Sequence, residues 1–218
     1  MSGEVSGASA MAIGLAFLIA CIDWWSVATN RRWVEAWAKP AVLVALIAAA
    51  VLLEPANSTI GWLVTFGLVC GLLGDIALFL DYFEIGAGAF LVGHIFYIAA
   101  FVYAWTSWVY SLVVMILGLI LIATVGRRIA TTASKYDERL ESLVLFYQVA
   151  LVLMAVAGFG TTNPWVMVGA SLFVLSDTYL GWTRFVGRET TPSRVIVHVT
   201  YHLAQACFVI SLVALTAS

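Results

Sequence analysis

Long apolar stretches separated by short polar breaks dominate this chain and limit the folds available to it. Each stretch is about 20 residues long, the length that an α-helix needs to cross the hydrocarbon core of a bilayer. Because the stretches use almost the whole chain, the sequence predicts an all-α integral membrane protein with one membrane domain, residues 1–218. Eight transmembrane helices are expected, at about residues 10–29, 37–53, 60–80, 86–105, 107–125, 139–158, 163–183 and 194–216.

The composition excludes a soluble domain. Hydrophobic residues make up 63% of the chain and charged residues only 10%, whereas about a quarter of the residues of a soluble globular domain are charged. Cys21, Cys70 and Cys207 all lie inside apolar stretches and lack the CxxC spacing of a metal or redox site. They are therefore expected to be buried thiols.

Basic residues are confined to one side of the predicted membrane. Lysine and arginine are enriched in cytoplasmic loops, so the odd-numbered connections are predicted to be cytoplasmic and both termini to lie outside, in a multi-pass protein of the cell membrane. All ten basic residues flank the first, fifth and seventh connections: Arg31, Arg32, Lys39, Arg127, Arg128, Lys135, Arg139, Arg184, Arg188 and Arg194.

Two parts of the sequence resemble each other weakly. A small residue followed by an aspartate is succeeded by His-x-x-Tyr both at Asp75 with His94-Ile95-Phe96-Tyr97 and at Asp177 with His198-Val199-Thr200-Tyr201. This order is typical of two parallel four-helix repeats, about residues 10–105 and 107–216, related by an axis along the membrane normal. Coincidence is the alternative, because short patterns recur easily in an apolar chain.

Polar side chains inside the predicted helices gather toward the cytoplasmic side. A carboxylate within a bilayer costs several kcal/mol unless it is paired, hydrated or protonated, so such residues usually mark functional sites. The pattern predicts a polar cavity open to the cytoplasm, with the outer halves of the helices almost wholly apolar. Its candidate residues are Lys39, Asp75, His94, Tyr97, Ser176, Asp177, Tyr201 and Gln205.

The same residues also have a purely structural interpretation. Asp75 could pair with Lys39, and Asp177 could accept hydrogen bonds from Tyr201 or His202. Each aspartate would then hold helices together without taking part in a reaction.

The remaining ionisable residues of the helices are considered separately. Asp23 lies beside two tryptophans near a helix end and is expected at the membrane interface. His198 and His202 are four residues apart, a spacing that can bind zinc on one helix face, with His94 or an aspartate as a third ligand. The spacing lacks the adjacent glutamate of a zinc hydrolase motif, so no metal and no cofactor is expected.

Five short motifs in order resemble the YhhN family of lysoplasmalogenases, which are small eight-helix membrane hydrolases. The similarity runs from the second to the eighth predicted helix. The matching stretches are Lys39-Pro40, Leu73-Gly74-Asp75, Gly86-Ala87-Gly88-Ala89-Phe90 ahead of His94 and Tyr97, Gly169-Ala170-Ser171-Leu172-Phe173 ahead of Ser176-Asp177, and Tyr201 with Ala204-Gln205.

The resemblance implies hydrolysis of the vinyl ether bond at the sn-1 position of a lysoplasmalogen. The products would be a fatty aldehyde and a glycerophospho-ethanolamine or -choline, and the partners a lysophospholipid and membrane lipids, with no nucleic acid. Such chemistry needs a proton donor and a carboxylate that stabilises positive charge, roles that suit Asp75 and Asp177. Lys39 could hold the lipid phosphate.

Two other functions fit the same pattern. A transporter or lipid-binding protein could use the polar cavity for protons or a solute, although the polar groups do not continue into the outer halves of the helices. A metal-dependent lipid hydrolase could use His198 and His202, and loss of activity on chelation would identify it. The sequence sets no oligomeric state.

Overall fold

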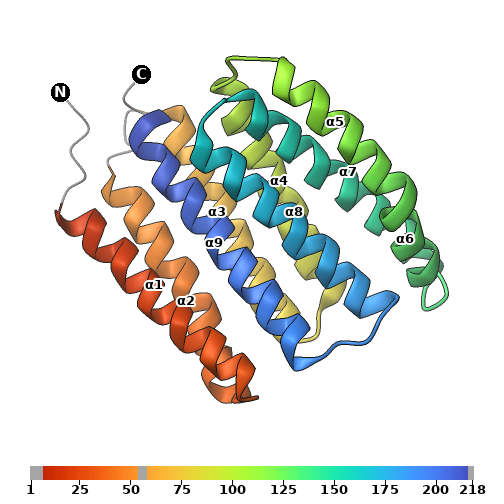
Figure 1. Ribbon diagram of the computed structural model, residues 1–218. Coiled ribbons are helices and arrows are strands. Elements are labelled where there is room, and N and C mark those ends of the chain that lie inside the picture. The colour runs from red at the N-terminus through yellow and green to blue at the C-terminus, as the bar shows by residue number, and fades with distance from the viewer. Residues whose placement is uncertain (1–6, 54–57, 216–218) are drawn as a thin grey trace.

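Long helices packed side by side make up residues 7–53 and 58–215, the parts of the chain that this computed structural model describes (Figure 1). No β-strand occurs in these ranges, which confirms the all-α fold. In chain order the elements are α1 (Gly7–Ala28), α2 (Arg32–Leu52), α3 (Thr59–Phe79), α4 (Phe83–Tyr103), α5 (Val109–Leu121), a π-helical turn (Ile122–Gly126), α6 (Arg127–Ala133), α7 (Glu138–Gly160), α8 (Pro164–Phe185) and α9 (Thr191–Leu215).

Seven of the described helical segments are long and apolar enough to cross a membrane, with α5, the π turn and α6 forming one continuous segment of 25 residues. Helix α8 is long enough, at 22 residues, but is absent from this set. It carries Ser176, Asp177, Thr178 and Arg184, which lower its hydropathy. The eighth span therefore stays a prediction. The helix concerned, α8, holds the candidate catalytic residue Asp177.

Two predicted boundaries were wrong. Helix α2 begins at Arg32 rather than near residue 37, so Pro40 lies inside the helix and Lys39 about two turns from its start. The acidic Glu35 in the first turn suits the positive end of the helix dipole. The fifth segment continues past residue 125 to Ala133, because arginine favours helix beyond the apolar stretch. The predicted end of the last helix, residue 216, lies outside the described residues.

Helix α9 contacts four other helices. It pairs with α8 and also touches α1, α2 and α3, while α3 pairs with α4 and α4 packs on α7. The combined α5 and α6 segment lies against α7 at the outer edge of the bundle (Figure 1). A polar face on α9 is therefore placed to meet side chains from three other helices.

Aromatic side chains form the centre of the bundle. Tyr97, Phe101, Phe173 and Phe208 are each at most 1% exposed, and their ring centroids lie 4.9 to 6.3 Å apart. Glycines on α3 permit this packing. A Cβ atom on Gly74 would lie 2.7 Å from the ring of Phe90 on α4, so the two helices approach more closely than larger residues would allow.

The odd-numbered connections all lie at one end of the antiparallel bundle. The connections between α1 and α2, α3 and α4, α6 and α7, and α8 and α9 meet there (Figure 1). The basic residues consequently gather at this end. Its assignment to the cytoplasm, and that of the termini to the outside, stays a prediction.

Candidate active site

A polar cavity opens at the basic end of the bundle. It has a volume of about 360 Å³ and is lined from the connection of α1 to α2 and from α2, α3, α8 and α9. Its charged lining residues include Arg32, Lys39, Asp75, Arg184 and Arg194. We call this cavity the vestibule.

A narrower cavity adjoins the vestibule. It has a volume of about 60 Å³, lies among α3, α4, α6, α7 and α8, and has an almost entirely apolar lining. Its polar lining residues are Tyr147, Gln148, Asp177 and Thr178. We call it the apolar pocket. Leu78, Phe83 and Leu180 line both cavities, so a polar and an apolar compartment meet at a shared wall.

Asp75 contributes to the vestibule and is held by a lysine. The Nζ atom of Lys39 lies 3.0 Å from Oδ1 of Asp75, whose side chain is 1% exposed. The same ammonium lies 5.5 Å from the centre of the Tyr201 ring. A neighbouring cation favours the charged form of a carboxyl group, so this aspartate is suited to stabilising positive charge or accepting a proton.

Tyr97, Tyr201 and Gln205 form a polar group next to Asp75. The Tyr97 hydroxyl donates a hydrogen bond of 2.6 Å to Oε1 of Gln205. A Cβ atom on Gly71 would lie 3.0 Å from both Nε2 of Gln205 and the Tyr201 hydroxyl. The absence of a side chain on Gly71 therefore lets α9 bring these groups against α3.

Asp177 has quite different neighbours. The Tyr147 hydroxyl donates a short hydrogen bond to Oδ2 of Asp177, and Nε2 of His94 lies 4.0 Å from the same oxygen. Nδ1 of His94 is 2.7 Å from the carbonyl oxygen of Phe90, so Nδ1 carries the hydrogen and, in the neutral ring, Nε2 is free to accept one. No cation contacts this carboxyl group among the described residues.

Like His94, Tyr97, Tyr201 and Gln205, Ser176 lines neither cavity. Its hydroxyl donates a hydrogen bond of 3.2 Å to the carbonyl oxygen of Val197, and Ser176 as a whole is 1% exposed. It joins α8 to α9. The other predicted site residues, Lys39, Asp75, His94, Tyr97, Asp177, Tyr201 and Gln205, lie in the two groups just described.

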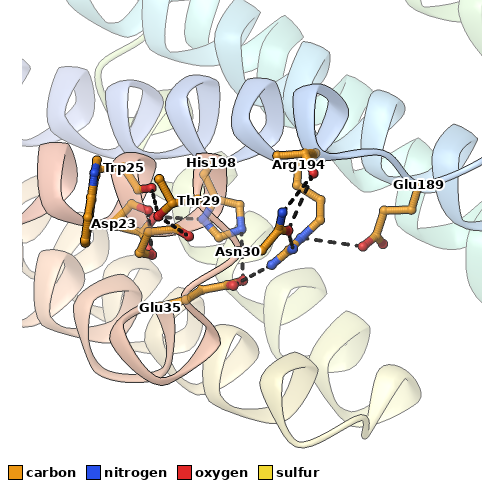
Figure 2. Close-up of polar contacts among 10 residues, drawn as sticks. Asp23, Trp25, Thr29, Asn30, Glu35, Glu189, Arg194 and His198 are labelled. Carbon is orange, nitrogen blue, oxygen red and sulfur yellow. Dashed lines mark hydrogen bonds and ion pairs between the residues drawn. The ribbon is translucent and has the colours of Figure 1, made fainter.

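The expectation that Asp23 lies at the membrane interface was wrong. Its side chain is fully buried, and its Oδ2 atom lies 2.7 Å from Nδ1 of His198 (Figure 2). The other ring nitrogen of His198 faces Glu35, which is paired with Arg194. Asp23 is buried because α9 offers it a polar partner, and nothing in the sequence of α1 indicates that partner.

The two histidines of α9 have protein partners that do not form a metal site. The indole nitrogen of Trp24 donates to Nδ1 of His202 over 3.2 Å, so the hydrogen of that ring is on Nε2. His198 bridges Asp23 and Glu35. Within residues 7–53 and 58–215, no group of three or more His, Cys, Asp or Glu side chains is arranged to hold a metal ion.

Comparison with known proteins identifies the family of the chain. The model of the YhhN family matches residues 34–212. The chain belongs to the YhhN family. The match includes both aspartates and their neighbours but not α1. Lysoplasmalogenase TMEM86B of Mus musculus is 28% identical over 204 residues, which cover 89% of this chain and 84% of that protein. No solved structure matches the chain.

Proposed function

We propose that this protein is a membrane lipid hydrolase that cleaves the sn-1 vinyl ether bond of lysoplasmalogens. One observation carries the proposal: a polar and an apolar cavity meet at a shared wall, with Asp75 in one and Asp177 in the other. The scissile bond of a lysoplasmalogen lies between a polar glycerophosphate part and an alkyl chain, so it would sit at this junction. A lysoplasmalogenase relative supports the same substrate class.

Asp177 is the proton donor in this mechanism. Its surroundings are almost entirely apolar and no cation contacts it among the described residues, and burial of this kind favours an uncharged carboxylic acid. Tyr147 holds the carboxyl group in position through its hydrogen bond. Asp177 transfers its proton to the second carbon of the alkenyl chain, and the first carbon becomes part of an oxocarbenium ion. The charged carboxylate of Asp75 stabilises this ion across the junction.

Water completes the reaction. A water molecule attacks the first carbon and gives a proton to Asp75. The product of this step is a hemiacetal. Asp75 then returns this proton to the glycerol oxygen as the carbon–oxygen bond breaks, and the hemiacetal hydroxyl gives its proton to Asp177. The products are a fatty aldehyde and a glycerophospho alcohol, and both carboxyl groups are restored. Nε2 of His94 lies where it can hold a water molecule beside Asp177.

Arginines of the vestibule bind the phosphate. Lys39 is held by Asp75, and Arg194 by Glu35, so neither is the best phosphate ligand. Arg32 and Arg184 also line the vestibule and have no carboxylate partner among the described ion pairs. The guanidinium of Arg184 lies 4.4 Å from the centre of the Phe83 ring, at the wall shared with the apolar pocket. Arginine can form two parallel bonds to a phosphate.

The substrate enters from the cytoplasmic leaflet, because the vestibule opens at the end that carries the basic residues. Labelling a Lys135→Cys variant in intact cells with a membrane-impermeant thiol reagent tests this orientation. The thiol at position 135 should be labelled only after the membrane is permeabilised. Labelling in intact cells would place the vestibule on the outer side.

The activity is tested with purified protein in detergent and three lipids of matched chain length. These are the 1-alkenyl, 1-acyl and 1-alkyl lysophospholipids, with fatty aldehyde and fatty acid both measured. Only the 1-alkenyl lipid should react, and in heavy water the aldehyde should carry deuterium on the carbon next to its carbonyl group. Release of fatty acid from the 1-acyl lipid at a similar rate would make the protein a lysophospholipase instead.

A further inference from the structure

A second polar group forms part of the vestibule wall and extends from it to α1. Asp23 on α1, Glu35 on α2 and His198 on α9 meet there, and Arg194 connects the group to the exposed Glu189 (Figure 2). The reaction proposed above uses none of these side chains directly. We call Asp23, His198 and Glu35 the α1–α9–α2 triad.

The contacts of His198 fix the relative positions of three helices. Its Nδ1 atom donates to Oδ2 of Asp23 over 2.7 Å, and its Nε2 atom lies 3.7 Å from Oε1 of Glu35. Asp23 is fully buried, and its Oδ1 atom has no hydrogen-bond partner among the described residues. A buried carboxylate with so few partners is costly, so Asp23 depends on His198 for its stability in this position.

Glu35 passes this constraint to Lys39. The two residues are four apart on α2, so they lie on the same face, one turn from each other. Arg194 of α9 holds Glu35, His198 lies 3.7 Å from it, and Tyr201 on the same helix lies beneath the Lys39 ammonium. Asp23 and Glu35 are also among the charges within electrostatic range of Lys39. Movement of α2 relative to α9 would therefore displace Lys39 from Tyr201 and change its position relative to Asp75 on α3.

We propose that the α1–α9–α2 triad positions Lys39, and through it Asp75, so that α1 supports the reaction without touching the substrate. The catalytic consequence of this inference rests on the proposed function. The positioning of Lys39 by the triad can be tested without any measurement of activity. It also gives a role to a helix outside the residues matched by the family model. Asp23, His198 and Glu35 are positioning residues in this sense.

Lys39 itself offers a direct measurement. The chain contains only two lysines, Lys39 and Lys135. Lys39 has an 18% exposed side chain paired with Asp75, whereas Lys135 is exposed near the start of the connection to α7. Acetylation of purified protein followed by peptide mass spectrometry gives the labelling of Lys39 relative to Lys135. An ammonium released from its carboxylate reacts faster, so this ratio reports the position of Lys39.

The variants are Asp23→Asn and Glu35→Gln, with Trp24→Phe as the matched control. Trp24 neighbours Asp23 and makes another hydrogen bond between α1 and α9, to His202. The triad variants should raise the labelling ratio severalfold and lower kcat by about 10- to 100-fold, with KM little changed, because small displacements of catalytic groups cost this much. Trp24→Phe should change neither quantity. Thermal unfolding of each variant is measured in parallel.

The outcomes separate this inference from the proposed function. If the wild-type protein hydrolyses no vinyl ether, the proposed function fails, but the labelling ratio still decides whether the triad positions Lys39. A ratio in Asp23→Asn that equals the wild-type value overturns the inference even when hydrolysis is confirmed. So does an equal rise in Trp24→Phe, because it would mean that any loosening of α1 exposes Lys39.

Discussion

Asp75 and Asp177 occupy corresponding positions in the two weakly similar parts of the sequence, yet their surroundings differ in charge. Asp75 faces the polar vestibule and is paired with the Lys39 ammonium. Asp177 faces the apolar pocket and is bonded to the uncharged Tyr147 hydroxyl. These surroundings suit the two roles proposed above, a charged carboxylate for Asp75 and a proton donor for Asp177.

The comparison shows that the partner from the preceding helix distinguishes the two sites. Lys39 on α2 binds the aspartate of α3, and Tyr147 on α7 binds the aspartate of α8. The Lys39 cation favours the charged form of Asp75, whereas the apolar surroundings of Asp177 favour its uncharged form. The internal repeat itself stays a prediction, because the difference in partners is compatible with either common ancestry of the halves or coincidence.

The largest expected effect comes from removing either carboxyl group. Asp177→Asn and Asp75→Asn should each lower kcat for the 1-alkenyl lipid by about 100-fold or more, the usual contribution of a general acid or base. Asparagine keeps the shape and part of the hydrogen bonding but cannot transfer the proton or carry the charge. The amount of folded protein in the membrane is measured alongside. Near-normal rates in either variant would refute the two-carboxylate mechanism.

The next largest effect is expected for Lys39→Ala, which distinguishes the surroundings of Asp75 from those of Asp177. Since Lys39 contacts Asp75 rather than Asp177, we expect kcat to fall by about 10- to 100-fold with a small change in KM, as for loss of a transition-state contact. Lys39→Arg keeps the charge and should recover part of the rate. A raised KM with unchanged kcat would instead assign Lys39 to the phosphate, which is the role that the sequence alone suggested.

Much of the fold could be predicted from the sequence. Apolar length and proline or polar breaks located the eight helical segments, because a bilayer imposes one helix length on any spanning segment. The start of α2 was missed because the predicted segment follows the apolar stretch, whereas the helix begins at Arg32 among the polar residues before it. The extension to Ala133 was missed because the apolar stretch ends near residue 125, whereas the helix continues beyond it.

The candidate site was only partly predictable. Asp75 and Asp177 stand out because charges are rare within apolar stretches. Tyr147 does not stand out, since a tyrosine in such a stretch is common and its partner Asp177 is 30 residues away. Asp23 was misjudged for a similar reason: its partner His198 is 175 residues away. Pairings between distant helices depend on packing, which periodicity within one helix does not encode.

Tyr147→Phe tests the surroundings of Asp177 without removing the carboxyl group. The variant deletes one hydrogen bond and keeps the ring that packs against His94 at a centroid distance of 5.2 Å. We expect kcat to fall by about tenfold, the usual effect of one buried hydrogen bond on a free-energy difference. Tyr110→Phe, at an exposed tyrosine of α5, is the control. If Tyr147→Phe leaves kcat unchanged, Tyr147 has no part in holding the acid.

The smallest expected effect concerns Arg184 in the vestibule, the cavity that Asp75 also lines. Arg184→Ala should raise KM by about five- to tenfold while kcat is largely kept, because a phosphate contact is present equally in the ground and transition states. Arg188→Ala is the matched control, since Arg188 is exposed on the connection that follows α8 but does not line the vestibule. The effect should weaken at high salt, because the contact is partly exposed and electrostatic. A lower kcat with unchanged KM in Arg184→Ala would mean that Arg184 acts through Phe83 on the junction of the two cavities, and the phosphate would then have to be assigned to Arg32.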